Sequence, residues 1–343
     1  MSQLSYSAPR LFLGSKEIIN FSSINYKNSG NNNVSTLTVK ITDPEMDDAA
    51  LMGKELIFYL NEGCVDSVPF FRGFVRQFTP SDKDLSIVAH DVLSFLAGAE
   101  SPPLTISDHQ NYDGYTLGQM LYDYIETYVN KTQTIIGLDM LNDSNPPVSM
   151  SGYRKENTTP LKVVQELLKE NKSDLTDIKN TRLVVRDDGT KSNICFIQEQ
   201  GKDSAGANFT FNDGIEKLNY KRRPTPNFYT QQVGNNKMTY QHNSLPTGIS
   251  MGTLRGDFDY PDEAREQAFV NATASEDKKE ISITTNKGHY LELGNVIKLQ
   301  TYEHPELTGK HRIVSKSIGV GSKTTCTLGL SKDAPQVRDF INV

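Results

Sequence analysis

The chain of 343 residues contains no tryptophan, and its three cysteines lie far apart in the sequence. Cys64, Cys195 and Cys326 form no C-x-x-C pair, so they indicate neither a disulfide framework nor a structural zinc site. No stretch approaches the roughly 18 apolar residues of a membrane helix, and the N-terminus lacks the basic and apolar regions of a signal peptide. We therefore expect no membrane association and folding in a reducing cytoplasm.

An excess of positive charge is also missing, because 36 lysines and arginines face 42 acidic residues and the net charge is −6. A protein that binds nucleic acid through its backbone needs a basic surface that displaces counterions, so we expect no specific nucleic-acid binding. The one basic cluster is Lys221, Arg222 and Arg223, next to two prolines. It is either a solvated linker or a possible interface, in which arginine pairs with carboxylates of an acidic partner.

The residues that carry metal or phosphate chemistry are not grouped in the sequence. The histidines are His90, His109, His242, His289, His304 and His311. No two of them lie within four residues, which excludes the H-E-x-x-H zinc motif. The stretch 319–324 (GVGSKT) has some likeness to a phosphate loop, but strands flank it on both sides and favour a hairpin turn. We predict no catalytic residues, no metal and no cofactor.

Residues 1–100 have the pattern of a β domain. Apolar and polar residues alternate in the four stretches 37–41, 55–60, 70–78 and 85–91, which is typical of half-buried strands. Turn-forming residues separate these stretches. The prediction is a meander or a small barrel of short strands.

Residues 101–204 have the pattern of an α+β module. Thr116 is suited to cap a helix whose apolar residues recur at helical spacing as far as Tyr128. Thr159 and Pro160 can open a second helix, because proline at the first helical position has no N–H to leave unpaired. Asp188 and Gly189 favour a hairpin between two strands.

Residues 205–343 begin with a segment rich in glycine and polar residues, 205–234, which we interpret as a linker. A helix is predicted from Asp259 to Ala272. Strand patterns then return in the four stretches 281–285, 295–299, 311–315 and 325–330.

The two β regions are built alike, which indicates an internal repeat. In the first region Gly53 precedes one strand and Gly73 the next, and in the second region Gly294 and Gly309 take these places. Glycine before a strand usually serves a turn or a close backbone approach. We therefore expect these four glycines to be structural repeat positions.

The order of these elements resembles the baseplate hub proteins of contractile phage tails and the N-terminal part of type VI secretion spike proteins. The resembling stretches are LMGK (51–54), FRGFV (71–75), IVAHDVL (87–93), YRKENTTPLKVV (153–164), LGNVIKL (293–299) and LTGKHRIV (307–314). The resemblance implies an α+β, mainly β fold with two similar tube-type β-barrel domains and a helical α+β module between them. The domains are then 1–100, 101–204 and 205–343, with the second barrel in the last.

The resemblance also implies a function in structure and not in catalysis. Such hubs are homotrimers of pseudo-sixfold symmetry that adapt a trimeric spike to a hexameric tail tube. The implied partners are further copies of the chain, the tail tube protein, a separate spike protein and other baseplate proteins. The implied location is the virion tail baseplate, assembled in the host cytoplasm.

Three alternatives remain open at this point. The first is the hub domain of a tail-associated protein in a non-contractile tail. The second is a cell-wall glycan hydrolase that uses two of the many carboxylates as acid and base. The third is a carbohydrate-binding β protein, which the lack of tryptophan makes less attractive.

Overall fold

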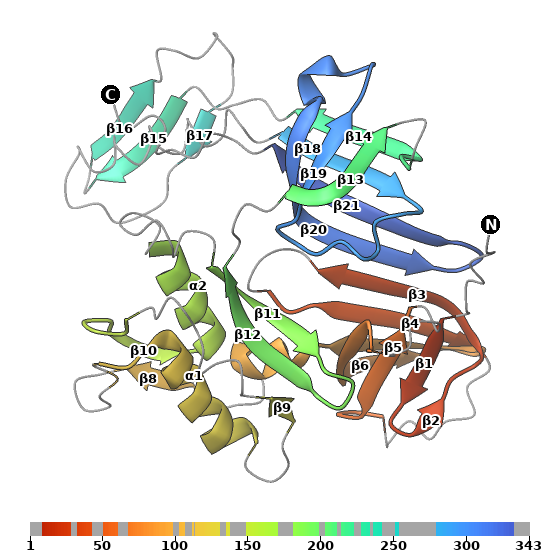
Figure 1. The fold of residues 1–343 in the computed structure, drawn as a ribbon. Coiled ribbons are helices and arrows are strands. Elements are labelled where there is room, and N and C mark those ends of the chain that lie inside the picture. Colours follow the sequence, from red (N-terminus) through yellow and green to blue (C-terminus); the bar gives the residue numbers. More distant parts are fainter. Residues whose placement is uncertain are drawn as a thin grey trace. The chain divides into compact units, whose positions relative to one another are not determined.

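The structure, a computed structural model shown in Figure 1, describes most of the 343 residues. The described ranges are 9–28, 33–42, 51–60, 68–98, 103–106, 112, 114–130, 135–137, 149–170, 181–198, 203–210, 214–222, 228–233, 236–241, 251–253 and 279–332. The chain divides into two compact units. The first comprises Met1–Ala205, Asn286–Asn295 and Val314–Thr327, and the second comprises Gly206–Thr285, Val296–Ile313 and Leu328–Val343.

The first strand set belongs to the first unit. Its strands are β1 (Arg10–Leu13), β2 (Lys16–Glu17), β3 (Phe21–Asn28), β4 (Thr36–Thr42), β5 (Glu55–Tyr59), β6 (Phe71–Pro80) and β7 (Asp84–His90). They are ordered β3-β4-β7-β6-β5-β1-β2, and every pair is antiparallel. The predicted strands 37–41, 55–60, 70–78 and 85–91 are thus confirmed as β4 to β7.

Alternation of side chains explains the pairing of β4 with β7. Leu37, Val39 and Ile41 of β4 are at most 2% exposed, and every second residue of β7 is buried as well. Val39 lies opposite Ile87, so a slip of one residue would turn both apolar rows to solvent. The apolar pattern therefore fixes the register.

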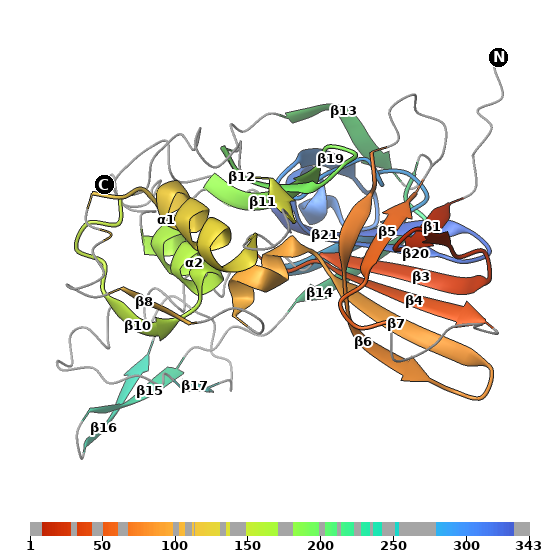
Figure 2. The same cartoon turned by 90° about the horizontal axis from the view of Figure 1, so that it is seen from below.

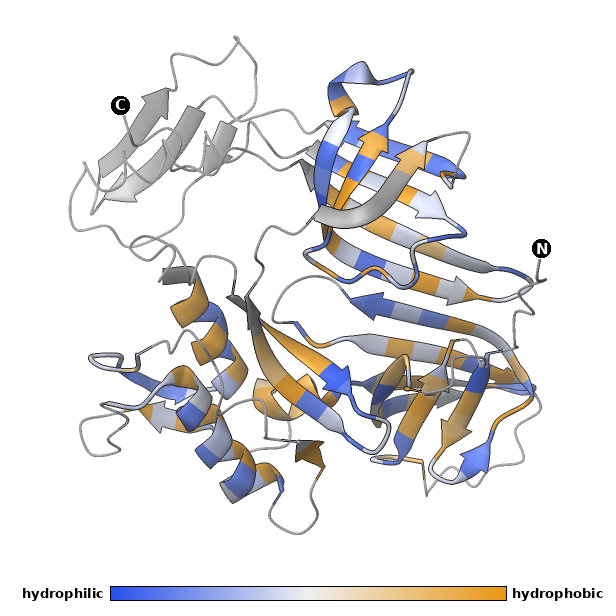
Figure 3. Ribbon diagram, in the orientation of Figure 1, coloured by the Kyte–Doolittle hydropathy of each residue, from blue (hydrophilic) through white to orange (hydrophobic). Residues whose placement is uncertain are grey.

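The α+β module also lies in the first unit. Its elements are a 3₁₀ helix (Val92–Ala97), β8 (Leu104–Ile106), α1 (Leu117–Tyr124), a π-helical turn (Ile125–Val129), β9 (Ile136–Gly137), β10 (Lys155–Thr158), α2 (Pro160–Glu170), β11 (Thr181–Asp187) and β12 (Ser192–Gln198). Figure 2 shows α1 and α2 side by side. In Figure 3 polar and apolar residues alternate around both helices, and their apolar residues share one buried cluster.

Capping residues set the starts of both helices, as predicted. Thr116 accepts a hydrogen bond from the Gln119 N–H, and the Gln119 side chain accepts one from the Thr116 N–H, which completes a capping box. Thr159 accepts a hydrogen bond from the N–H of Lys162 at the start of α2. The hairpin is also confirmed, because β11 and β12 pair from Asp187 opposite Ser192 outwards.

The second strand set comprises β13 (Asp203–Thr210), β14 (Lys217–Arg222), β18 (Lys279–Thr285), β19 (Val296–Gln300), β20 (Gly309–Val320) and β21 (Thr324–Lys332). They are ordered β14-β18-β21-β20-β19-β13. A short 3₁₀ helix (Pro305–Leu307) precedes β20. A separate small sheet of β15 (Phe228–Val233), β16 (Asn236–Gln241) and β17 (Met251–Thr253) is ordered β16-β15-β17.

The two strand sets have the same topology. If β2 and the small sheet are set aside, each set has six strands, and their positions in chain order run 2-3-6-5-4-1 across the sheet. Thus β1, β3, β4, β5, β6 and β7 correspond in turn to β13, β14, β18, β19, β20 and β21. The fold is mainly β with a smaller helical part, and its sheet topology is duplicated.

The linker prediction for 205–234 is wrong, because most of β13, the whole of β14 and β15 lie there. β14 pairs along its length with β18, from Lys217 opposite Thr284 to Arg222 opposite Lys279. Leu218 and Tyr220 are half-buried while Lys217, Asn219 and Lys221 are exposed. A strand at the end of a sheet needs only such a weak apolar row, so the polar composition of this segment is misleading.

Two further points concern the described ranges alone. The helix predicted from Asp259 to Ala272 lies outside them. Among the helices that the structure describes, none is long and apolar enough to cross a membrane.

Candidate functional site

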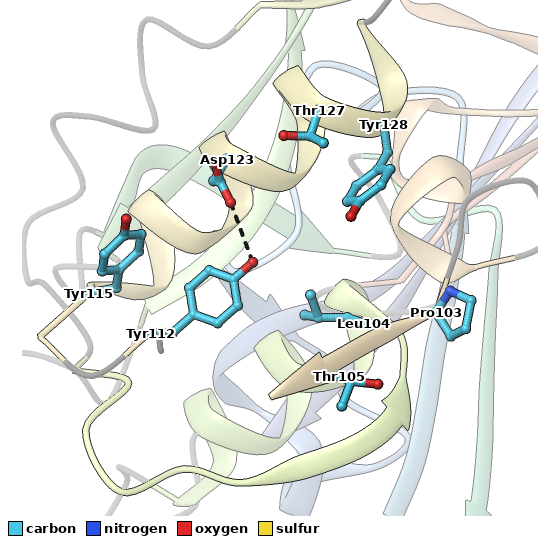
Figure 4. Close-up of a pocket in the computed structure, with 8 residues that line it drawn as sticks. All are labelled: Pro103, Leu104, Thr105, Tyr112, Tyr115, Asp123, Thr127 and Tyr128. Atoms are coloured by element: carbon cyan, nitrogen blue, oxygen red, sulfur yellow. Dashed lines mark hydrogen bonds between the residues drawn. The ribbon is translucent and has the colours of Figure 1, made fainter. Parts of the chain in front are cut away.

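A tyrosine-lined pocket lies beside α1 and β8, with a cavity volume of about 340 Å³. Its lining residues, drawn in Figure 4, are Pro103, Leu104, Thr105, Tyr112, Tyr115, Asp123, Thr127 and Tyr128. Tyr115 and Tyr128 are 41% and 50% exposed. The Tyr112 hydroxyl donates to the Asp123 carboxylate at 3.4 Å. Burial, and then the negative charge of Asp123, raise the pKa of Tyr112 to about 12.

The lining chemistry bears on the hydrolase alternative. Asp123 is the one carboxylate among the eight lining residues. Glycoside hydrolysis by the usual route needs two carboxyl groups that flank the scissile bond. This pocket therefore offers hydroxyls and ring faces for contact, but not the acid and base pair of a glycosidase.

The described residues give no support to metal or nucleophile chemistry. Among them, no three His, Cys, Asp or Glu side chains gather as a possible metal site. The sequence has one G-x-S-x-G match at 248–252. In a nucleophile elbow the serine follows a strand and opens a helix. Here Ser250 is outside the described ranges, and the strand β17 begins at the next residue, Met251.

The first pair of repeat glycines takes equivalent places in two turns. The Lys54 N–H bonds to the Leu51 carbonyl, and the Asn295 N–H bonds to the Glu292 carbonyl. Gly53 (φ 75°) and Gly294 (φ 85°) are third in these four-residue turns, the position at which a type II turn requires positive φ. Each turn leads directly into a five-residue strand, β5 or β19.

The second pair of repeat glycines is not equivalent in register. Gly73 is the third residue of β6, opposite Leu56, whereas Gly309 begins β20 opposite Leu299. Gly73 is required by a close approach, because a Cβ there would lie 2.3 Å from the carbonyl oxygen of His90. Gly309 has room but a φ of 142°. The two glycines thus serve different purposes.

Replacing Gly73 with alanine is expected to destabilise the protein by about 1–3 kcal/mol, because backbone must move to admit the methyl group. Gly321→Ala is the matched control, since a Cβ there meets no atom within 4 Å, and it should stay within about 0.5 kcal/mol of the parent. Urea denaturation of both variants measures this. Equal stabilities would show that the close approach at Gly73 is relaxed at no cost.

The predicted basic interface is described only in part. Lys221 is an exposed residue of β14 and lies opposite Glu280 of β18. Arg222 ends the same strand opposite Lys279, and Arg223 is outside the described residues. β14, which holds Lys221 and Arg222, is an end strand of the second set.

A buried ion cluster fixes the module hairpin on the first strand set, and the sequence analysis missed it. Arg72 of β6 is 8% exposed. Its guanidinium donates to both carboxylate oxygens of Asp187, to Glu55 at 2.8 Å and to the Gly189 carbonyl at 3.1 Å. Asp187 and Gly189 belong to the β11–β12 hairpin. The only signal in the sequence is an arginine within the otherwise apolar first half of β6, Phe71 to Val75.

A second missed residue is Lys316 of β20, which is 8% exposed. Its ammonium group donates to the carbonyls of His289 and of Leu291, the latter at 2.7 Å, and lies 5.1 Å from the centre of the Phe70 ring. Burial lowers the pKa of Lys316 to about 8. The strand alternation with the buried Ile318 and Val320 could have placed this lysine inward.

No family model matches the sequence, and no curated protein matches it either. Structural similarity is extensive. A 43 kDa tail protein of prophage MuSo2 from Shewanella oneidensis aligns with a TM-score of 0.60 and 12% identity over 94% of this chain and 97% of its own. A tail protein from Neisseria meningitidis MC58 gives a TM-score of 0.61 and 12% identity over 96% and 97%.

A third similar structure comes from a secretion system. An E. coli component of the type VI secretion system, itself similar to tail proteins of bacteriophage T4, aligns with a TM-score of 0.55 and 9% identity over 95% of this chain and 77% of its own. The chain therefore has the fold of these tail and secretion proteins along nearly its whole length, which agrees with the resemblance drawn from the sequence.

Proposed function

We propose that the chain is a structural protein of a phage-type tail, and specifically the homotrimeric hub of a baseplate. The observation that carries the proposal is the duplicated order of six strands. In the proposal, the two strand sets are two similar tube-type β-barrel domains with the α+β module between them. Their boundaries are 1–100, 101–204 and 205–343.

Symmetry is the physical reason for this proposal. Three copies of a chain with two similar strand sets present six similar positions in a closed ring. The threefold symmetry of the three chains matches a trimeric spike, and the six similar strand sets match a hexameric tube. The partners are therefore other copies of the chain, the tail tube protein, a spike protein and other baseplate proteins, in the tail of the virion.

The solution mass of the purified chain tests the proposal. We expect light scattering to give three times the 38.3 kDa of one chain, and electron micrographs to show rings with six similar lobes. A chain that stays monomeric at all concentrations, and also when it is mixed with a trimeric spike protein, would contradict the hub.

A further inference from the structure

Strand β20 has two partners besides β21, and they occupy different stretches of it. β19, of the same strand set, pairs with Gly309 to Arg312. β3, of the first set, pairs antiparallel with the stretch from Lys316 to Val320. Within one chain, β20, the fifth strand of the second set, therefore pairs with β3, the second strand of the first set. We call this pairing the internal junction.

Since the two strand sets share one topology, the reciprocal of this junction is a contact between the fifth strand of the first set and the second strand of the second set. These strands are β6 and β14. β5 pairs with the first part of β6, Phe71 to Phe74. From Gln77 to Pro80, β7 is the one neighbouring strand of β6 in the described part of the chain, and β14 likewise has only β18. Among the described residues, both sheet edges are thus open.

We propose that β14 of one copy of the chain pairs antiparallel with residues Gln77–Pro80 of β6 in a second copy. The inference rests on the proposed function, because it names the contact that would join copies in the trimer. Each copy would use its β14 to pair with one neighbour and its β6 to pair with the other, so the contact is head-to-tail. Every copy has both edges paired only if the copies form a closed ring. Unpaired backbone groups of an end strand are a natural template for such an addition.

The register follows from the internal junction. Gly319 of β20 lies opposite Asn25 of β3. Counting back from the hairpin turns that end β6 and β20, Thr79 is the counterpart of Gly319. We take Asn219 as the counterpart of Asn25, because each lies opposite the first residue of its partner strand that separates two buried neighbours, Ser282 of β18 and Thr38 of β4. The same burial pattern recurs two residues later in both strands, at Thr284 and Lys40. Thr79 and Asn219 should therefore be directly opposed.

Exposure agrees with this pairing. Gln77, Thr79 and Pro80 are exposed, and so are Lys217 and Asn219. In the inferred register Lys217 of one copy comes next to the β6–β7 turn of the other, where Asp82 is exposed. The turn also exposes Lys83, and the exposed Glu216 precedes Lys217, so charges of both signs meet at this end.

Disulfide trapping tests the inference. In a Cys64→Ser background, Thr79→Cys combined with Asn219→Cys is expected to give covalent dimers and trimers under mild oxidation, because opposed strand residues are within disulfide reach. Either cysteine alone should give no trimer. The control pair is Thr38→Cys with Asn219→Cys, since β4 is already paired on both sides, and it should not cross-link.

The outcomes separate this inference from the hub itself. A chain that is trimeric by light scattering but does not cross-link at Thr79 and Asn219 overturns the inference and leaves the hub standing. A monomer at every concentration overturns the inference, while the hub is then judged by its assembly on the spike protein.

A charge exchange gives a second test that does not depend on cysteines. Asp82→Lys alone should weaken association by roughly threefold, as expected for an exposed pair, and the double variant Asp82→Lys with Lys217→Asp should restore it. Failure of the double variant to recover would contradict the register.

Discussion

Replacing Arg72 with leucine is expected to lower the free energy of unfolding by about 3–5 kcal/mol, because the substitution leaves the buried carboxylate of Asp187 without its cation. The Asp187 side chain is 6% exposed, so water cannot compensate. Glu55 is more accessible, at 35%, and should contribute less to the loss. Chemical denaturation of the parent and the variant measures the difference.

The matched control is Arg10→Leu, because Arg10 pairs with Glu17 on the surface, where both side chains are more than a third exposed. Exposed ion pairs contribute about 0–1 kcal/mol. The double variant Arg72→Leu with Asp187→Leu should recover much of the lost stability, since replacing a whole buried pair is often neutral. If Arg72→Leu and Arg10→Leu cost the same, the hairpin is not held by this cluster.

The second large effect concerns Lys316 and appears in alkaline solution. The free energy of unfolding of the parent, taken relative to a Lys316→Met variant, should rise by about 2–3 kcal/mol between pH 7 and pH 10. Below pH 8 the folded chain carries a buried charge at Lys316, whose folded pKa is about 8. Methionine has a similar length and no charge to desolvate.

The sign follows from proton binding. An unfolded lysine has a pKa of about 10.4. Between the folded and unfolded pKa values the unfolded chain therefore binds more protons, and stability increases with pH. Burial raises the pKa of the neighbouring Cys326 to about 11, which acts in the opposite direction but is present in both proteins.

Urea denaturation of the two proteins at several pH values gives the measurement. The exposed Lys298 of β19 supplies the control, because Lys298→Met should give a curve parallel to that of the parent. A Lys316→Met curve that is also parallel to the parent would show that the Lys316 pKa does not change on folding.

Local patterns predicted much of this fold. Strands β4 to β7 were expected because their apolar residues alternate, and the start of α1 because Thr116 precedes apolar residues at helical spacing. The turn at Gly53 was expected for a similar reason. In each case the cause lies within a few residues of the element itself.

Features set by distant residues were beyond such patterns. β13 and β14 are strands because β19 and β18 supply their partners, and their own composition has the character of a loop. Arg72 is buried because Asp187, more than a hundred residues later, neutralises it. Lys316 is buried because the carbonyls of His289 and Leu291 accept its hydrogens. The tyrosine pocket likewise draws on β8 and α1 together.

The two strand sets differ most in what joins their second and third strands. β3 and β4 are separated by residues 29–35, whereas β14 and β18 are separated by residues 223–278, which include the small sheet of β15 to β17. A ring built from six identical chains would have to carry such an appendage at all six places. A fused duplicate can acquire it in one half alone. In the proposed ring, the presence of both strand sets in one chain therefore lets selection act on alternate positions independently, so that neighbouring sites can evolve to hold different molecules.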